Sequence, residues 1–108
     1  MELLHIDDKS FHTEVEGSKG VVVVDFFATW CGPCRMLGPV LEQVQEELGK
    51  KVKIVKLDVD EGEKTARKFG IMSVPSLVIF KDGQEVDRLI GFRPKEQLVD
   101  YLNDLIQK

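Results

Sequence analysis

The strongest constraint on the fold is a run of β-branched and aromatic residues that contains a single acidic side chain. Residues 21–27 read Val-Val-Val-Val-Asp-Phe-Phe. Strong β propensity without apolar–polar alternation is typical of a central strand that is covered on both faces. The sequence therefore predicts a buried strand here, and it places the carboxyl group of Asp25 inside the core.

Helical spacing follows this strand. Apolar residues recur every three or four positions until a glycine stops the pattern, at Leu37, Leu41, Val44, Leu48 and Gly49. We expect a helix that begins near residue 32 and is kinked at Pro39.

The remaining elements are predicted from the same kinds of pattern. Strands are expected over residues 52–59, 76–81 and 85–90, with the last two joined as a hairpin. Shorter helices are expected over residues 9–16 and 63–69, and a C-terminal packing helix opens at Pro94. Strands separated by helices and followed by a hairpin predict an α/β fold with a mixed sheet covered on both faces. The 108 residues, 43% of them hydrophobic, predict one domain over 1–108.

Composition argues against several classes of function. The chain has 19 acidic and 15 basic residues, and its net charge of -4 has the wrong sign for binding nucleic acid. No run approaches the ~20 apolar residues of a membrane span. Residues 1–9 lack the apolar run of roughly 7 to 15 residues found in a signal peptide. We therefore expect no nucleic-acid or membrane partner and a cytoplasmic location.

Two cysteines, Cys31 and Cys34, lie between the buried strand and the long helix, and they are too few for the framework of a disulfide-rich secreted domain. Unpaired N–H groups at a helix N-terminus favour a thiolate at Cys31, while Cys34 is shielded one turn into the helix. We expect Cys31 to attack a disulfide in a target protein and Cys34 to resolve the mixed disulfide, without a cofactor. Pro33 suits the first helical turn, and Gly32 leaves room for a partner chain.

A zinc site is the main chemical alternative, because a Cys-x-x-Cys pair is also half of a tetrahedral site. Two further ligands would be needed. The two histidines of the chain, His5 and His12, lie far upstream without a ligand-like spacing. We expect both to be surface residues and expect no bound metal.

Asp25 allows a structural and a functional interpretation. Burial raises the pKa of a carboxyl group, because desolvation penalises its charged form. The structural interpretation is a carboxylate satisfied by hydrogen bonds or by Lys56, which shares a strand face with Val52 and Ile54. In the functional interpretation, which we favour, Asp25 exchanges a proton with Cys34, since perturbed acids cluster near active sites.

The string Trp30-Cys31-Gly32-Pro33-Cys34, preceded by residues 24–29, resembles the active-site signature of the thioredoxin family. Residues 56–60, 69–76 and 81–83 also resemble segments of that family, so the resemblance covers nearly the whole chain. It implies the thioredoxin fold, a central mixed sheet of about five strands flanked by four helices. It also implies a protein-disulfide reductase, because glutaredoxins and disulfide-forming oxidases usually differ in the dipeptide between the cysteines.

The resemblance further implies a binding groove beside the cysteines. Pro75 is expected to be cis and to face them, and an extended segment of the target would pair with the backbone of Val74. The groove residues carried over are Trp30, Val74, Pro75 and Gly91. Without the resemblance, Val74 and Gly91 would be interpreted as a core hydrophobe and a strand glycine.

Two positions depart from the family pattern. Phe27 stands where many thioredoxins have tryptophan, and Phe92 stands where a small residue is common. We expect both to flank the groove and to affect the choice of target.

The expected partners are disulfide-containing proteins and a thioredoxin reductase, either NADPH-linked or ferredoxin-linked, and the chain is expected to be a monomer. A different class of function is a thioredoxin-like binding subunit that uses the groove without exchanging thiols. The presence of both cysteines argues against that as the sole role.

Overall fold

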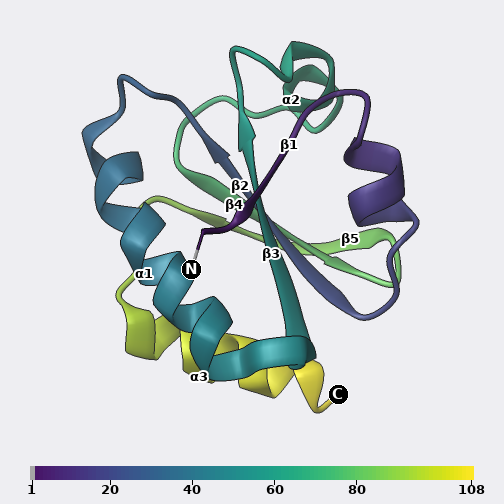
Figure 1. Ribbon diagram of the computed structural model, residues 1–108, viewed down its shortest axis with the longest axis vertical. Coiled ribbons are helices and arrows are strands. Elements are labelled where there is room, and N and C mark those ends of the chain that lie inside the picture. The colour runs from purple at the N-terminus through teal and green to yellow at the C-terminus, as the bar shows by residue number, and fades with distance from the viewer. Residues whose placement is uncertain (1) are drawn as a thin grey trace.

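The buried strand predicted from the valine run lies at the centre of a five-stranded mixed sheet. In the computed structural model, which describes residues 2–108, the strand order is β1-β3-β2-β4-β5 (Figure 1). The central strand pairs in parallel with β3 and antiparallel with β4. The strands are β1 (Leu4–Ile6), β2 (Val21–Phe27), β3 (Val52–Asp58), β4 (Ser76–Lys81) and β5 (Gln84–Ile90). Met1, the first residue of the predicted domain, lies outside the described residues.

Helices cover both faces of this sheet, which explains why β2 shows no alternation. Val21 and Val23 pack in a core cluster with residues of α1 (Gly32–Leu48) and α3 (Lys95–Ile106). Val22, Val24 and Phe26 pack on the opposite face with residues next to or within η1 (His12–Glu16) and α2 (Glu63–Lys68). All seven residues of β2 are therefore buried, as the sequence predicted.

The helix that carries the cysteines has the predicted extent. α1 continues through Pro39 and ends at Gly49, whose φ of 56° is easily adopted by glycine. A short 3-10 helix, η2 (Gly49–Lys51), then leads into β3. The Gln45 side chain donates to the carbonyls of Gly49 and Val52 and accepts from the N–H of Ile54, which fixes the end of α1 against β3.

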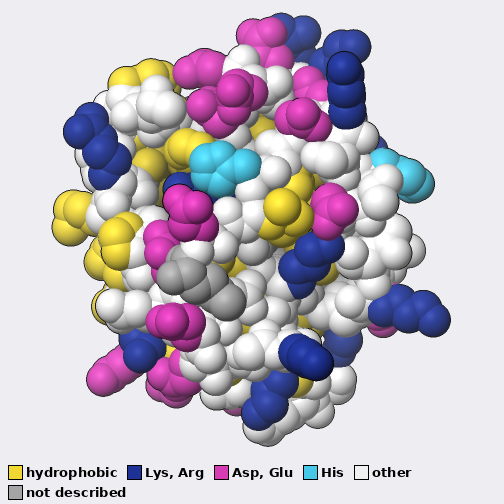
Figure 2. Space-filling model, in the orientation of Figure 1, with side chains coloured by type: hydrophobic (Ala, Val, Ile, Leu, Met, Phe, Trp, Pro, Cys, Tyr) yellow, Lys and Arg dark blue, Asp and Glu magenta, His cyan; other side chains and the backbone are white. Residues whose placement is uncertain are grey.

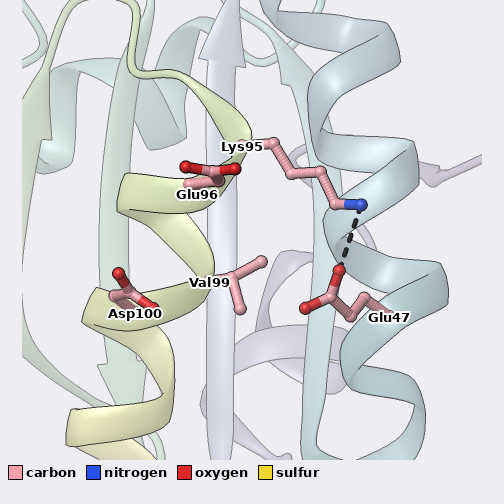
Figure 3. Close-up of a pocket in the computed structure, with 5 residues that line it drawn as sticks. All are labelled: Glu47, Lys95, Glu96, Val99 and Asp100. Carbon is pink, nitrogen blue, oxygen red and sulfur yellow. Dashed lines mark ion pairs between the residues drawn. The ribbon is translucent and has the colours of Figure 1, made fainter.

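α1 and α3 also make an ion pair across their shared groove. Lys95 Nζ lies 3.0 Å from Glu47 Oε1, above Val99 (Figure 3). This contact joins the start of α3 to the last turns of α1.

Four expectations on element boundaries need correction, and one of them is the strand expected over 52–59, which ends at Asp58. The helix expected over 9–16 is a π-helix over His12–Glu16, because the carboxylate of Asp7 accepts from the N–H groups of Lys9 and Ser10 and holds that segment as a turn. The helix expected over 63–69 ends at Lys68, and the hairpin strand begins at Gln84 rather than at residue 85. The fifth strand, β1, was not located from the sequence because it has three residues, two of them exposed.

The β4–β5 hairpin is held against the rest of the molecule at its turn. The N–H of Gly20 donates to Asp82 Oδ1 at 2.7 Å, and the N–H of Asp82 donates back to the Gly20 carbonyl at 3.0 Å. Gly83, with a φ of 85°, lies so close to the backbone carbonyl of Glu16 that a Cβ atom would overlap it. The turn therefore fits closely against the end of η1.

Among residues 2–108, no helix has the length and apolar character needed to cross a bilayer.

Candidate functional site

The two cysteines form a disulfide at the N-terminus of α1. Cys31 is the N-cap residue, with extended backbone geometry, and its Sγ accepts from the N–H of Cys34 at 3.2 Å. Pro33 occupies the first helical turn, where a backbone N–H has no partner within the helix, so proline loses no hydrogen bond there. Both cysteines are buried, while Gly32 and Pro33 are exposed. The positions predicted for the disulfide and for the helix start are confirmed.

A second segment lies over the disulfide. The Val74–Pro75 peptide bond is cis, as the family resemblance implied. The carbonyl oxygen of Val74 lies 3.8 Å from Cys31 Sγ, and the Val74 side chain packs against a small cluster of Phe27, Ala28, Cys31 and Cys34. The loop before β4 therefore lies against Cys31 Sγ.

A third segment joins these two through the backbone. The N–H of Gly91 donates to the carbonyl of Pro75 at 2.9 Å, and Gly91 has a φ of 90°. Beside it Phe92 is partly exposed, and Trp30, at 68% exposed, lies next to Cys31 in the chain. The structure thus links Cys31 to Val74 and Pro75 to Gly91.

Two residues of this region were not predicted from the sequence. Met72 is 96% exposed in the loop before the cis peptide. Arg93 donates from Nη1 to the carbonyls of Ile90 and Phe92. These two hydrogen bonds stabilise the loop that carries Gly91. No local pattern marks either residue, because their roles depend on how loops distant in sequence meet.

Phe27, which was expected to flank the groove, is buried in the cluster against which Val74 packs. The side chains at positions 25 and 27 lie on the same face of β2, because strand residues alternate. Phe27 is 9% exposed and packs against both cysteines. Its ring also contacts His5, with ring centroids 5.8 Å apart, and lies 4.5 Å from Lys56 Nζ.

Asp25 is the most unusual group near the site. Its side chain is fully buried, and among the described residues neither carboxyl oxygen has a hydrogen-bond partner. Of the two forms of the structural interpretation, satisfaction by hydrogen bonds is therefore not observed, whereas Lys56 is the cross-strand partner of Asp25. Burial raises the pKa of Asp25 to about 7, and the charge of Lys56, its cross-strand partner, opposes that rise.

Among the described residues, the site has no cluster of metal ligands around it. Within residues 2–108, no group of three or more His, Cys, Asp or Glu side chains is placed to hold a metal ion. The two histidines are exposed, as expected. His5 lies against Phe27, and His12 lies 3.2 Å from the carboxylate of Glu16.

Comparison with known proteins agrees with this geometry. A family model described as thioredoxin matches residues 2–104. A thioredoxin of Listeria monocytogenes is 54% identical over 101 residues, which cover 94% of this chain and 96% of the relative. Thioredoxins of Bacillus subtilis and Staphylococcus aureus are each 50% identical over 103 residues, covering 95% of this chain and 97% of each relative. With its cysteine pair at the N-terminus of α1 and these relatives over nearly its whole length, the chain belongs to the thioredoxin family and is a thiol–disulfide oxidoreductase that reduces protein disulfides.

Proposed function

We propose that Cys31 is the attacking thiol and Cys34 the resolving thiol of this reductase. The observation that carries the assignment is the hydrogen bond from the Cys34 N–H to Cys31 Sγ at the N-terminus of α1. After reduction, the same N–H and the helix dipole stabilise a thiolate at Cys31 more than at Cys34.

The reaction balances as a two-electron exchange. The Cys31 thiolate attacks one sulfur of the target disulfide, which forms a mixed disulfide and releases the first target thiolate. Cys34 loses its proton and attacks Cys31 Sγ, which closes the internal disulfide and releases the second target thiolate. The two electrons of the dithiol pass to the target, whose released thiolates take up protons from water.

Asp25 is proposed as the proton acceptor for Cys34 in the second step, with Lys56 moderating its charge. A base is most effective when its pKa lies close to the working pH, and burial brings the pKa of Asp25 to about 7. The carboxyl group has no hydrogen bond to lose when it takes up the proton, at least among the described residues.

The proposed target-binding groove lies around the disulfide, beside the exposed Gly32 and Pro33. An extended target segment would pair with the backbone of Val74, and such pairing tolerates many sequences. The proposed lining is Trp30, Gly32, Pro33, Val74, Pro75, Gly91 and Phe92. The partly exposed ring of Phe92 adds apolar area at one side of this groove.

The proposed setting follows from reductase chemistry. The partners of such a protein are disulfide-containing targets and a reductase, which we propose is NADPH-linked or ferredoxin-linked. A reducing compartment such as the cytoplasm keeps the dithiol available. We further propose that the chain acts as a monomer and that residues 1–108 form one thioredoxin domain.

The test is the reduction of insulin disulfides by dithiothreitol, followed as turbidity. We expect strong acceleration by the wild type, none by Cys31→Ser, and a slower rate for Asp25→Asn at neutral pH. Cys34→Ser is expected to accumulate a mixed disulfide, which mass spectrometry detects after non-reducing quench.

A wild type that adds nothing to dithiothreitol alone would contradict reductase activity and favour the binding-subunit alternative. Activity in Cys31→Ser equal to wild type would contradict the assignment of the attacking thiol. An unchanged rate for Asp25→Asn would remove Asp25 from the proposed proton transfer.

A further inference from the structure

A hollow lies on the side of the sheet where β1 faces α1. Its volume is about 580 Å³, and it is lined by Glu2, Leu3, Leu4, His5, Glu42 and Lys56. On this face of the molecule a histidine, a recessed Lys or Arg side chain and acidic side chains gather between α1 and β1 (Figure 2). Three kinds of charged or titratable group therefore share one opening.

Lys56 connects this hollow to the buried carboxyl group of Asp25. The two residues are paired in the β2–β3 register, and both lie on the face of the sheet that α1 covers. Lys56 Nζ lies above the Phe27 ring, and a Cβ atom at Gly38 of α1 would be 3.8 Å from it. The ammonium group thus lies between α1 and the sheet, where it acts on Asp25 from one side and lines the hollow on the other.

His5 and Glu42 flank Lys56 from two different elements. His5 is the β1 residue in register with Lys56, and its ring contacts the same Phe27 side chain. Glu42 reaches the hollow from α1. The charged and titratable groups that face Lys56 are thus Glu2 and His5 from the β1 side, Glu42 from α1 and Asp25 from β2.

We propose that His5 and Glu42 are positioning residues of the thiol–disulfide reaction, which act through Lys56 across this hollow to set the proton affinity of Asp25. β3 lies between β1 and β2, so His5 and Asp25 are separated by two strand spacings, or about 10 Å, of packed protein. Charges at that separation interact measurably where water does not screen them fully.

The two residues act in opposite directions. The carboxylate of Glu42 disfavours a second negative charge at Asp25 and attracts the Lys56 ammonium away from it. A protonated His5 adds positive charge and favours the ionised form of Asp25. Removing Glu42 therefore lowers the pKa of Asp25, and removing His5 raises it.

The test measures the pKa of Asp25 itself, by NMR titration of its side-chain carboxyl carbon in the oxidised protein. We compare Glu42→Gln with Glu46→Gln, which removes the same charge one turn further along α1, and His5→Gln with His12→Gln, which removes the other histidine. Glu42→Gln is expected to lower the pKa of Asp25 by about half a unit relative to its control. His5→Gln is expected to raise it by a smaller amount relative to its control.

Values for Glu42→Gln and His5→Gln that coincide with their controls, or that move in the same direction, would overturn the proposal. A second readout is the pH profile of insulin reduction, whose alkaline rise should move with the Asp25 pKa in each variant. That readout rests on the proposed role of Asp25, whereas the NMR titration does not. If Asp25→Asn proves fully active, the proposed proton transfer is contradicted. The coupling of His5 and Glu42 to Asp25 is still decided by the NMR titration alone.

Discussion

At the scale of single residues, the buried carboxyl group of Asp25 makes the stability of the fold depend on pH. In the unfolded chain it ionises near its ordinary pKa of 3.8, whereas in the folded protein it ionises near 7. Between these values the folded state holds a proton that the unfolded state has released, so the free energy of unfolding falls as pH rises. The stabilising contribution is complete below pH 3.8 and is lost once pH exceeds about 7.

We therefore predict that the free energy of unfolding of the wild type drops by about 3 kcal/mol between pH 5 and pH 8, and that Asp25→Asn removes most of this drop. Urea unfolding of both proteins at the two pH values measures it. Four other carboxyl groups have a pKa that hydrogen bonds lower: Asp7, Asp8, Glu16 and Asp87. Their contribution to the free energy of unfolding is lost only at a pH more acidic than the range tested here, so they do not account for the drop. Parallel pH dependence in the two proteins would contradict the prediction.

Local residue chemistry was predictable where it depended on a short stretch of chain. The positions of Cys31 and Cys34 and the burial of Asp25 follow from neighbours in sequence. The burial of Phe27 follows from the same unbroken run of β-branched and aromatic residues that buries Asp25. The exposure of Met72 could not be predicted, because an apolar residue in a loop is buried or exposed by the elements that pack around it.

At the scale of elements, the turn of the β4–β5 hairpin is fixed by a close approach to η1. Gly20 and Gly83 both have positive φ, so alanine at either position meets backbone strain. A Cβ atom would have open space at Gly20 but would overlap the Glu16 carbonyl at Gly83.

We predict that Gly20→Ala lowers the free energy of unfolding by about 1 kcal/mol, and that Gly83→Ala lowers it by roughly 1 to 3 kcal/mol more. Chemical denaturation of the two variants, read against the wild type, gives the difference. Equal losses would mean that the contact with η1 adds nothing to the strain of the turn.

Elements were predictable in proportion to their length and apolar content. β2, α1 and α3 each bury a long stretch or face, and their boundaries follow closely from sequence. β1 has three residues and forms because its backbone pairs with the edge of β3, as Leu4 does with Val55 far along the chain. Neither its presence nor the π-helical form of η1 is encoded by a local period.

At the scale of the whole molecule, the redox state of the cysteines changes stability. Closing the disulfide between Cys31 and Cys34 restricts the unfolded chain over a short loop of four residues. We predict that the oxidised protein is more stable than the reduced protein by about 2 kcal/mol. Urea unfolding with and without dithiothreitol measures the difference, and Cys34→Ser should show none. Coincident transitions for oxidised and reduced wild type would contradict this.

The overall topology could not be predicted from local sequence patterns alone. Alternation of strands and helices predicted the α/β class, but the order β1-β3-β2-β4-β5 depends on which edges pair over long separations. The five-strand count and the cis bond before Pro75 came from family resemblance, and both are confirmed.

The contact between Val74 and Cys31 spans 43 residues of chain. During synthesis from the N-terminus, the two thiols leave the ribosome well before the loop that will lie over them. A nascent chain that ends before residue 74 therefore exposes a reactive dithiol without the surface proposed to select its targets. Pairing of β4 with β2 is the event that brings the Val74 carbonyl to Cys31, so control over which disulfides are reduced arises only when the sheet is assembled.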